Sequence, residues 1–108
     1  MNEMAKRPEK PSLEEEIVKK AKELGPNSPE VKELVSQWTI EQEQLVESKK
    51  DKTGGIKLDI NRADLYYKIG LFDESYESAC AAMDQAEEVG SEELFNKAQD
   101  LAEKISKA

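Results

Sequence analysis

Few side chains in this sequence are suited to catalysis or to holding a metal ion. The chain of 108 residues contains no histidine, which removes the commonest general base and a usual zinc ligand. Its one cysteine, Cys80, is flanked by alanines, so packing on the apolar face of a helix is a better interpretation than a nucleophilic role. Asp59 and Asn61 have the spacing that opens a calcium loop, but neither the glycine nor the glutamate that completes such a loop is in place. We therefore expect no catalytic residue, no metal site and no cofactor, and hence no enzyme.

The charge of the chain also limits its partners. Lysine and arginine number 16 and aspartate and glutamate 24, which gives a formal net charge of −8. Residues 1–54 hold 10 basic and 12 acidic side chains, whereas residues 55–108 hold 6 and 12. Nucleic acid is bound by clustered basic residues that displace the counterions of its phosphates, so we expect no nucleic-acid partner. An acidic surface favours a basic peptide or protein instead.

No segment of the sequence indicates a membrane or secreted protein. The run of about 20 apolar residues that crosses a bilayer is missing, and residues 1–8 lack the apolar stretch of a secretion signal. A single cysteine cannot form a disulfide within the chain, which fits a reducing compartment. We expect a cytoplasmic protein that does not bind membranes.

Helix signals dominate the sequence, and no strand signal appears. Residues 1–11 hold two prolines and no apolar periodicity, which indicates a disordered tail. Ser12 opens a first helix and Ser28 a second, each as an N-cap. Because the connection between them is short, these helices are expected to form an antiparallel hairpin over residues 12–50.

The clearest break in the chain follows this hairpin. Residues 51–58 contain two adjacent glycines, whose backbone freedom opposes helix formation, and we expect a flexible linker there. The linker separates residues 12–50 from residues 59–108. With the linker included, residues 12–108 are expected to form a single helical domain of about five helices.

Three of these helices follow the linker. Asp59 or Asn61 caps the first of them, and a glycine at position 70 ends it. Asp73 caps the next helix and Ser91 the last.

Apolar residues at helical spacing predict which face of each helix is buried. Trp38 lies at the centre of the stripe on the second helix, whereas Ile40 lies off that stripe. The stripe of the fourth helix is Tyr76, Ala79, Cys80, Met83 and Ala86, and that of the fifth is Leu94, Ala98, Leu101 and Ile105.

One stretch of the sequence resembles a known repeat. Residues 66–75 read Tyr-Tyr-Lys-Ile-Gly-Leu-Phe-Asp-Glu-Ser, which is similar to the middle of a tetratricopeptide repeat (TPR), Tyr-Tyr-x-x-Gly-x-Tyr-Asp-Glu-Ala. Ala82 falls where the family places the small residue of its second helix. The similarity covers about residues 60–88, and Ser75 departs from it by replacing alanine. Three repeats are normally needed for stability, so the first hairpin would act as a degenerate repeat or as an unrelated partner.

The resemblance implies a TPR-like helical array or small bundle that binds a peptide or protein along a groove. It places Tyr66 between the paired helices and implies that Asp64, Tyr67 and Lys68 are the partner-binding residues of that groove. We therefore expect an adaptor, a non-enzymatic protein–protein interaction module. The alternative is a homo-oligomer, in which Ile40 or the stripe of the fifth helix packs against a second copy of the chain.

Overall fold

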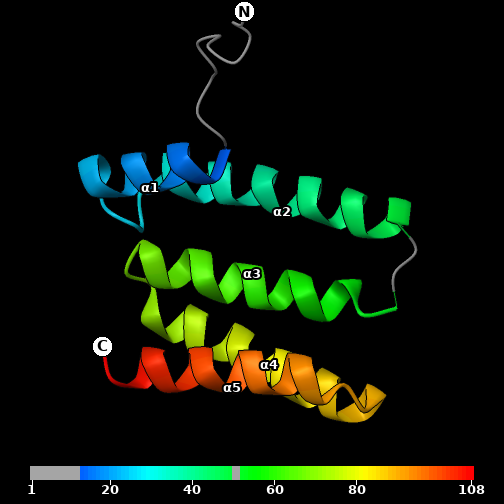
Figure 1. Cartoon of the computed structure of the whole chain (residues 1–108). Coiled ribbons are helices and arrows are strands. Elements are labelled where there is room, and N and C mark those ends of the chain that lie inside the picture. The colour runs from blue at the N-terminus through cyan, green and yellow to red at the C-terminus, as the bar shows by residue number, and fades with distance from the viewer. Residues whose placement is uncertain (1–12, 50–51) are drawn as a thin grey trace, which may run out of the picture.

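The computed structural model describes residues 13–49 and 52–108, and over these ranges the chain is all-α, as predicted (Figure 1). This part of the chain forms five helices: α1 (Leu13–Leu24), α2 (Pro29–Lys49), α3 (Gly54–Lys68), α4 (Phe72–Val89) and α5 (Glu92–Ser106). The expected tail 1–11 and the expected cap Ser12 lie outside the described residues.

The helices form antiparallel hairpins stacked one after another. α1 packs against α2, α3 against α4, and α4 against α5 (Figure 1). α3 lies in the middle of the stack, where it also contacts α1, α2 and α5. Within the described residues, the backbones of α2 and α4 do not come close enough to pack against each other. α1, α3 and α5 thus form a row of neighbouring helices, which α2 and α4 flank.

One apolar cluster joins the first three helices. Trp38 on α2 is only 4% exposed, which confirms its predicted role as the core anchor of that helix. The buried members of the cluster are Ile17, Ala21, Val31, Trp38, Leu58, Leu65 and Ile69. The N-terminal hairpin and α3 therefore share one core.

Small side chains line the contacts of α4 with α3 and α5. Two further apolar clusters lie there, and their fully buried alanines are Ala63, Ala79, Ala82, Ala86 and Ala98. Ser75 on α4 is also fully buried, and its hydroxyl donates a hydrogen bond to the backbone carbonyl of Ala63 on α3. Alanine and serine at these positions allow the backbones of the three helices to approach closely.

The position at which α3 begins differs from the prediction of a flexible linker over residues 51–58. The N-cap of α3 is Thr53 rather than Asp59 or Asn61, and residues 54–58, predicted to belong to a flexible linker, form the first turns of the helix. The two glycines do not prevent helix formation here, because the residues that follow them are held by tertiary packing.

Burial explains why α3 begins so early. Ile56 and Leu58 are 2% and 8% exposed, and the apolar surface that they bury offsets the entropy that a glycine loses in a helix. Gly54 itself lies against α2, where a Cβ atom would come within 2.5 Å of Cγ1 of Val46. The missing side chain thus lets the first turn of α3 pack closely on α2.

Serine caps are predicted correctly, whereas the cap of α4 is not. Ser28 and Ser91 each accept a hydrogen bond at Oγ from the backbone N–H three residues later. Asp73 lies inside α4, whose N-cap is Leu71. After the turn at Gly70, where φ is +89°, the Leu71 carbonyl accepts a hydrogen bond from the first turn of α4. The backbone of the turn therefore starts the helix without a side-chain cap.

The buried face of α4 also differs from the prediction. Tyr76 is 46% exposed, and Ser75 and Ala82 are buried instead. The predicted stripe of α5 is confirmed in its main members, since Leu94, Ala98 and Ile105 are buried. Because these three residues pack within the chain, the α5 stripe is not free to bind a second copy.

Candidate functional site

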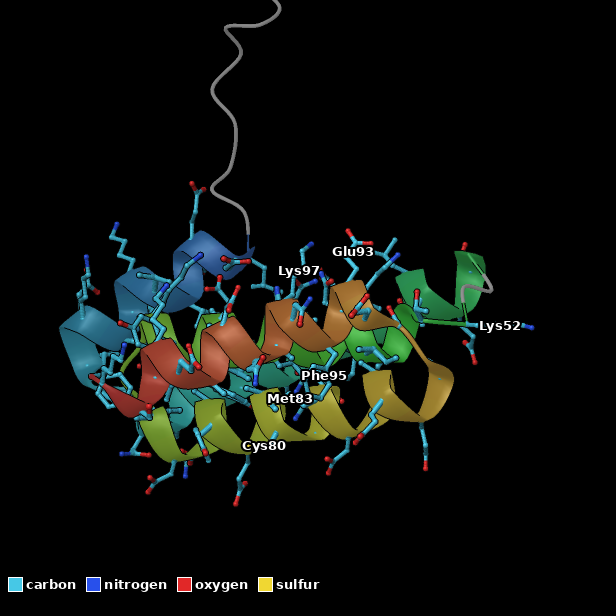
Figure 2. All side chains as sticks on the ribbon, turned by 60° about the horizontal axis from the view of Figure 1, so that its bottom comes forward. Lys52, Cys80, Met83, Glu93, Phe95 and Lys97 are labelled. Atoms are coloured by element: carbon cyan, nitrogen blue, oxygen red, sulfur yellow. The ribbon has the colours of Figure 1, made fainter. Side chains whose placement is uncertain are left out.

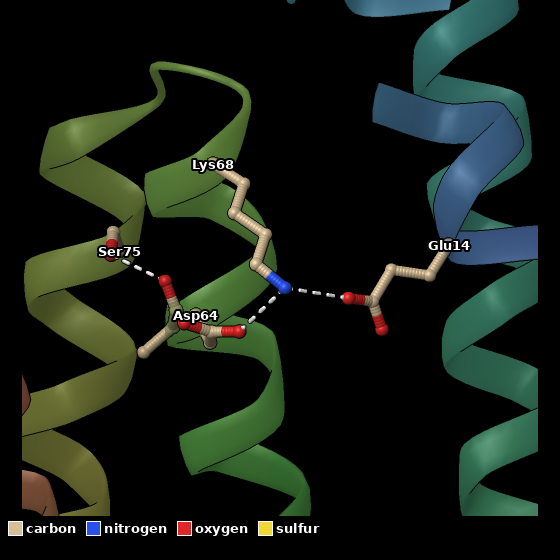
Figure 3. A network of polar contacts seen from close by, with 5 residues as sticks. Glu14, Asp64, Lys68 and Ser75 are labelled. Carbon is tan, nitrogen blue, oxygen red and sulfur yellow. Dashed lines mark hydrogen bonds and ion pairs between the residues drawn. The ribbon is translucent and has the colours of Figure 1, made fainter. Parts of the chain in front are cut away.

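Three charged side chains connect α3 to α1. Nζ of Lys68 lies 3.0 Å from Oε2 of Glu14 on α1 and 3.1 Å from Oδ2 of Asp64 one turn earlier on α3 (Figure 3). All three side chains are partly exposed. Two of the predicted partner-binding residues, Asp64 and Lys68, therefore lie in one surface ion network.

The carboxylates of this network raise the pKa of Lys68 above its ordinary value of 10.5. The larger cause is the hydrogen bond that the ammonium donates to Glu14, followed by the one to Asp64. Because the folded state holds this proton more tightly than the unfolded state, the stabilisation is complete below pH 10.5 and is lost as the pH rises through the folded pKa. Lys68 is thus charged at neutral pH, in ion pairs whose exposed geometry is worth about 0.2–1 kcal/mol.

Tyr67, the third predicted residue, lies nearer to α4 and α5. The centroid of its ring is 5.7 Å from that of Phe72, at the start of α4. Nζ of Lys104 on α5 lies 4.7 Å from the centroid of Tyr67, within range of a cation–π contact. The predicted residues are therefore divided, with Asp64 and Lys68 beside α1 and Tyr67 beside α5.

The surface between α3 and α5 is hollowed near the beginning of both helices. The hollow has a volume of about 530 Å³, and its lining includes Lys57, Ile60, Asn61, Glu93, Leu94 and Lys97. This hollow, together with the Tyr67–Lys104 contact and the network of Glu14, Asp64 and Lys68, forms one surface. We call this surface the α1–α3–α5 face. It offers ammonium groups, carboxylates, an amide and an aromatic ring to a bound chain, which is chemistry suited to recognition.

Tyr66 lies away from this face. It packs against the apolar cluster of the first three helices, and the guanidinium carbon of Arg62 lies 6.0 Å from the centroid of its ring. Tyr66 also lines a hollow with Val35 of α2 and Leu71. The structure thus places this tyrosine beside α2, whereas the resemblance assigns it to the space between the paired helices.

The described residues contain no group of three histidine, cysteine, aspartate or glutamate side chains placed to hold a metal ion. The absence of a cofactor stays a prediction. Reasoning from the sequence missed the lining of the hollow and also Glu14 and Lys104, since neither of these two lies at helical spacing from the α3 residue that it contacts. The Asp64–Lys68 pair, four residues apart, is the contact that a sequence pattern can indicate.

Comparison of the chain with models of protein families, with curated protein sequences and with solved structures found no match. In residues 13–49 and 52–108, no helix combines the length and the apolar character needed to cross a bilayer. Fold and site together define a small all-α array of helical hairpins with a row of three helices presenting a surface of mixed charge.

Asp59 is a further polar group held between helices. It accepts a hydrogen bond from Nε2 of Gln85 on α4 at 2.9 Å and lies 3.8 Å from NH1 of Arg62. Burial raises the pKa of Asp59 above its ordinary value of 3.8, although Gln85 and Arg62 act in the opposite direction. The ionised carboxylate therefore opposes folding at pH values above the folded pKa, and this cost disappears below pH 3.8.

Asp59→Asn is expected to be at least as stable as the unsubstituted chain at pH 7, and to lose this advantage as the pH falls. Asparagine keeps an acceptor for Gln85 but removes the half-buried charge. Urea unfolding at pH 7 and at about pH 4, followed by the fluorescence of Trp38, measures the two differences. A variant that is less stable than the original chain at pH 7 would contradict this account of Asp59.

Proposed function

We propose that this protein is a non-enzymatic interaction module that binds a peptide or protein segment along the α1–α3–α5 face. The observation that carries the proposal is the position of the hollow between α3 and α5. One side of the hollow is formed by α3, the helix to which Asp64, Tyr67 and Lys68 also belong. A segment lying in the hollow and continuing along α3 would meet both charge signs and a tyrosine ring. Such a surface selects a partner by hydrogen bonds and ion pairs.

The TPR-like character is part of this proposal. The resemblance of residues 66–75 is supported by the packing order, because each hairpin contributes its first helix to one row and its second helix to the flank. In that scheme α1 and α2 act as a degenerate repeat, and α5 covers the end of the array. The buried Ser75 takes the place of the usual alanine and still allows α3 and α4 to approach closely.

The partner is proposed to be basic, and the protein to be cytoplasmic. The net charge of −8 attracts basic segments at long range, although the α1–α3–α5 face itself carries both signs. A single, half-buried cysteine is compatible with a reducing compartment.

Selection from a random peptide library displayed on phage tests the face. Synthetic copies of the selected peptides are expected to bind Tyr67→Ala and Asp64→Lys at least about tenfold more weakly, a loss of about 1.4 kcal/mol. Tyr76→Ala and Glu43→Lys are the matched controls, since they make equivalent changes at exposed positions of α4 and α2. Peptides whose affinity is the same for all four variants would exclude this face.

One observation favours a second candidate function, self-association. Ile40 on α2 is 52% exposed, as its position off the stripe predicts, and could pack against another copy. Light scattering at high protein concentration would then give twice the mass of 12.2 kDa, and Ile40→Glu would restore the mass of the monomer. A monomer at all concentrations excludes this candidate.

A further inference from the structure

A second surface lies along α4 and α5, and it adjoins the α1–α3–α5 face where Phe72 contacts Tyr67. By helical periodicity, four side chains lie on one side of α4: Phe72, Tyr76, Cys80 and Met83. Met83 packs in a cluster with Phe95 of α5. Phe72 and Tyr76 are 44% and 46% exposed, and Cys80 and Met83 are half-buried. Figure 2 shows Met83 of α4 and Phe95 of α5 next to each other between the two helices, with Cys80 nearer to the start of α4. We call these five residues the α4–α5 groove.

The α4 residues of this surface form an extended apolar strip. The spacing of its α4 residues is four, four and three, so they form one ridge about 17 Å long at 1.5 Å per residue. Beyond Met83, the ridge leads to an open hollow of about 540 Å³ at the α4–α5 turn, lined by Ala86, Gly90 and Phe95 and also by the acidic residues Glu87 and Glu92. A ridge of this spacing, three turns long, is the surface against which another helix packs.

Carboxylates border this groove on both sides. α4 contains six acidic residues and neither lysine nor arginine. By helical periodicity Asp73, Glu77 and Asp84 follow the outer edge of its apolar ridge, and Glu92 and Glu103 follow the corresponding edge of α5.

The basic residues of α5 lie on its other side. Lys97 lines the hollow between α3 and α5, and Lys104 lies over Tyr67 of α3. Figure 2 shows Lys97 across α5 from Phe95 and Met83. The charges of α5 are therefore separated, and the side that borders the groove is acidic.

We infer that the α4–α5 groove binds an amphipathic helix that has lysine or arginine residues on both sides of its apolar stripe. The apolar stripe would cover Tyr76, Met83 and Phe95, and the basic side chains would pair with the carboxylates of both edges. The charge of the groove also favours a basic helix over a second copy of this acidic chain as its binding partner. A second copy of this chain, docked through the same groove, would place carboxylates against carboxylates. This interaction goes beyond the proposed function, because the groove shares no residue with the α1–α3–α5 face.

The test uses a synthetic probe. It is a fluorescein-labelled peptide of about 18 residues, long enough to span α4, with leucines at helical spacing and lysines on both sides of the leucine stripe. Fluorescence anisotropy is expected to show saturable binding that weakens as salt is added. Tyr76→Ala and Glu77→Lys are each expected to weaken binding about tenfold.

Matched controls distinguish the groove from general attraction to an acidic protein. Glu43→Lys on α2 makes the same change of charge as Glu77→Lys, and Leu45→Ala on α2 truncates another exposed apolar side chain, as Tyr76→Ala does on α4. Both controls are expected to bind the probe with unchanged affinity, and the proposed function is tested with other peptides, so the two proposals can fail independently. Three results would each overturn the inference. They are equal binding of a peptide with glutamate in place of lysine, equal weakening by Glu43→Lys and Glu77→Lys, and the absence of saturable binding.

Discussion

Leu65→Ala is expected to lower the free energy of unfolding by about 2–5 kcal/mol, the usual cost of removing a leucine from a packed core. Leu65 is on α3, is 1% exposed, and belongs to the cluster that contains Ile17 of α1 and Trp38 of α2. The cavity left by the substitution would open where three helices meet. Chemical denaturation of the variant, compared with the unsubstituted chain, measures the loss.

The single tryptophan makes this experiment informative about cooperativity. Trp38 fluorescence reports the core between α2 and its neighbours, and circular dichroism reports all helices. One shared transition is expected, because α3 belongs to the core of the first hairpin and to the clusters of α4 and α5. Leu45→Ala is the control, since Leu45 is 52% exposed and its truncation should change stability by less than about 0.5 kcal/mol. Separate transitions for the two signals would contradict a common core.

Features of the fold that depend only on residues close together in the sequence could be predicted. Ser28 and Ser91 cap helices because a serine oxygen needs only a backbone N–H three residues away. The beginning of α3 could not be predicted, because glycines normally break a helix and the burial of Ile56 and Leu58 arises from contacts with distant helices. Local propensity is a weak guide wherever such packing decides the conformation.

The candidate site shows the same limit. The pairing of Asp64 with Lys68 follows from their spacing on one helix, but the position of Glu14 follows from the way in which α1 packs on α3. For Tyr76, the spacing on one helix predicted burial that the structure does not show. Its spacing fits the stripe of α4, yet the neighbouring Ser75 is small enough to occupy the contact with α3, so the tyrosine is left at the surface.

Ala82→Leu is expected to destabilise the protein by about 1–3 kcal/mol, because it overpacks the contact of α4 with α3 and α5. Ala82 is fully buried in a cluster with Ile56 of α3 and with Leu94 and Ala98 of α5. A leucine there would have to push α3 and α5 apart or leave its preferred rotamer. Both α4–α5 and α3–α4 contacts would weaken together.

Ala81→Leu supplies the control within the same helix. Ala81 is half-buried and belongs to none of the three apolar clusters, so the same gain in volume should change stability by less than about 0.5 kcal/mol. Urea unfolding followed at Trp38 would detect the loss caused by Ala82→Leu even though the tryptophan lies in the other cluster, provided that the array unfolds as one unit. If both leucine variants were equally stable, the small residues of α4 would not be needed for close packing, and the best support for a repeat-like hairpin would be lost.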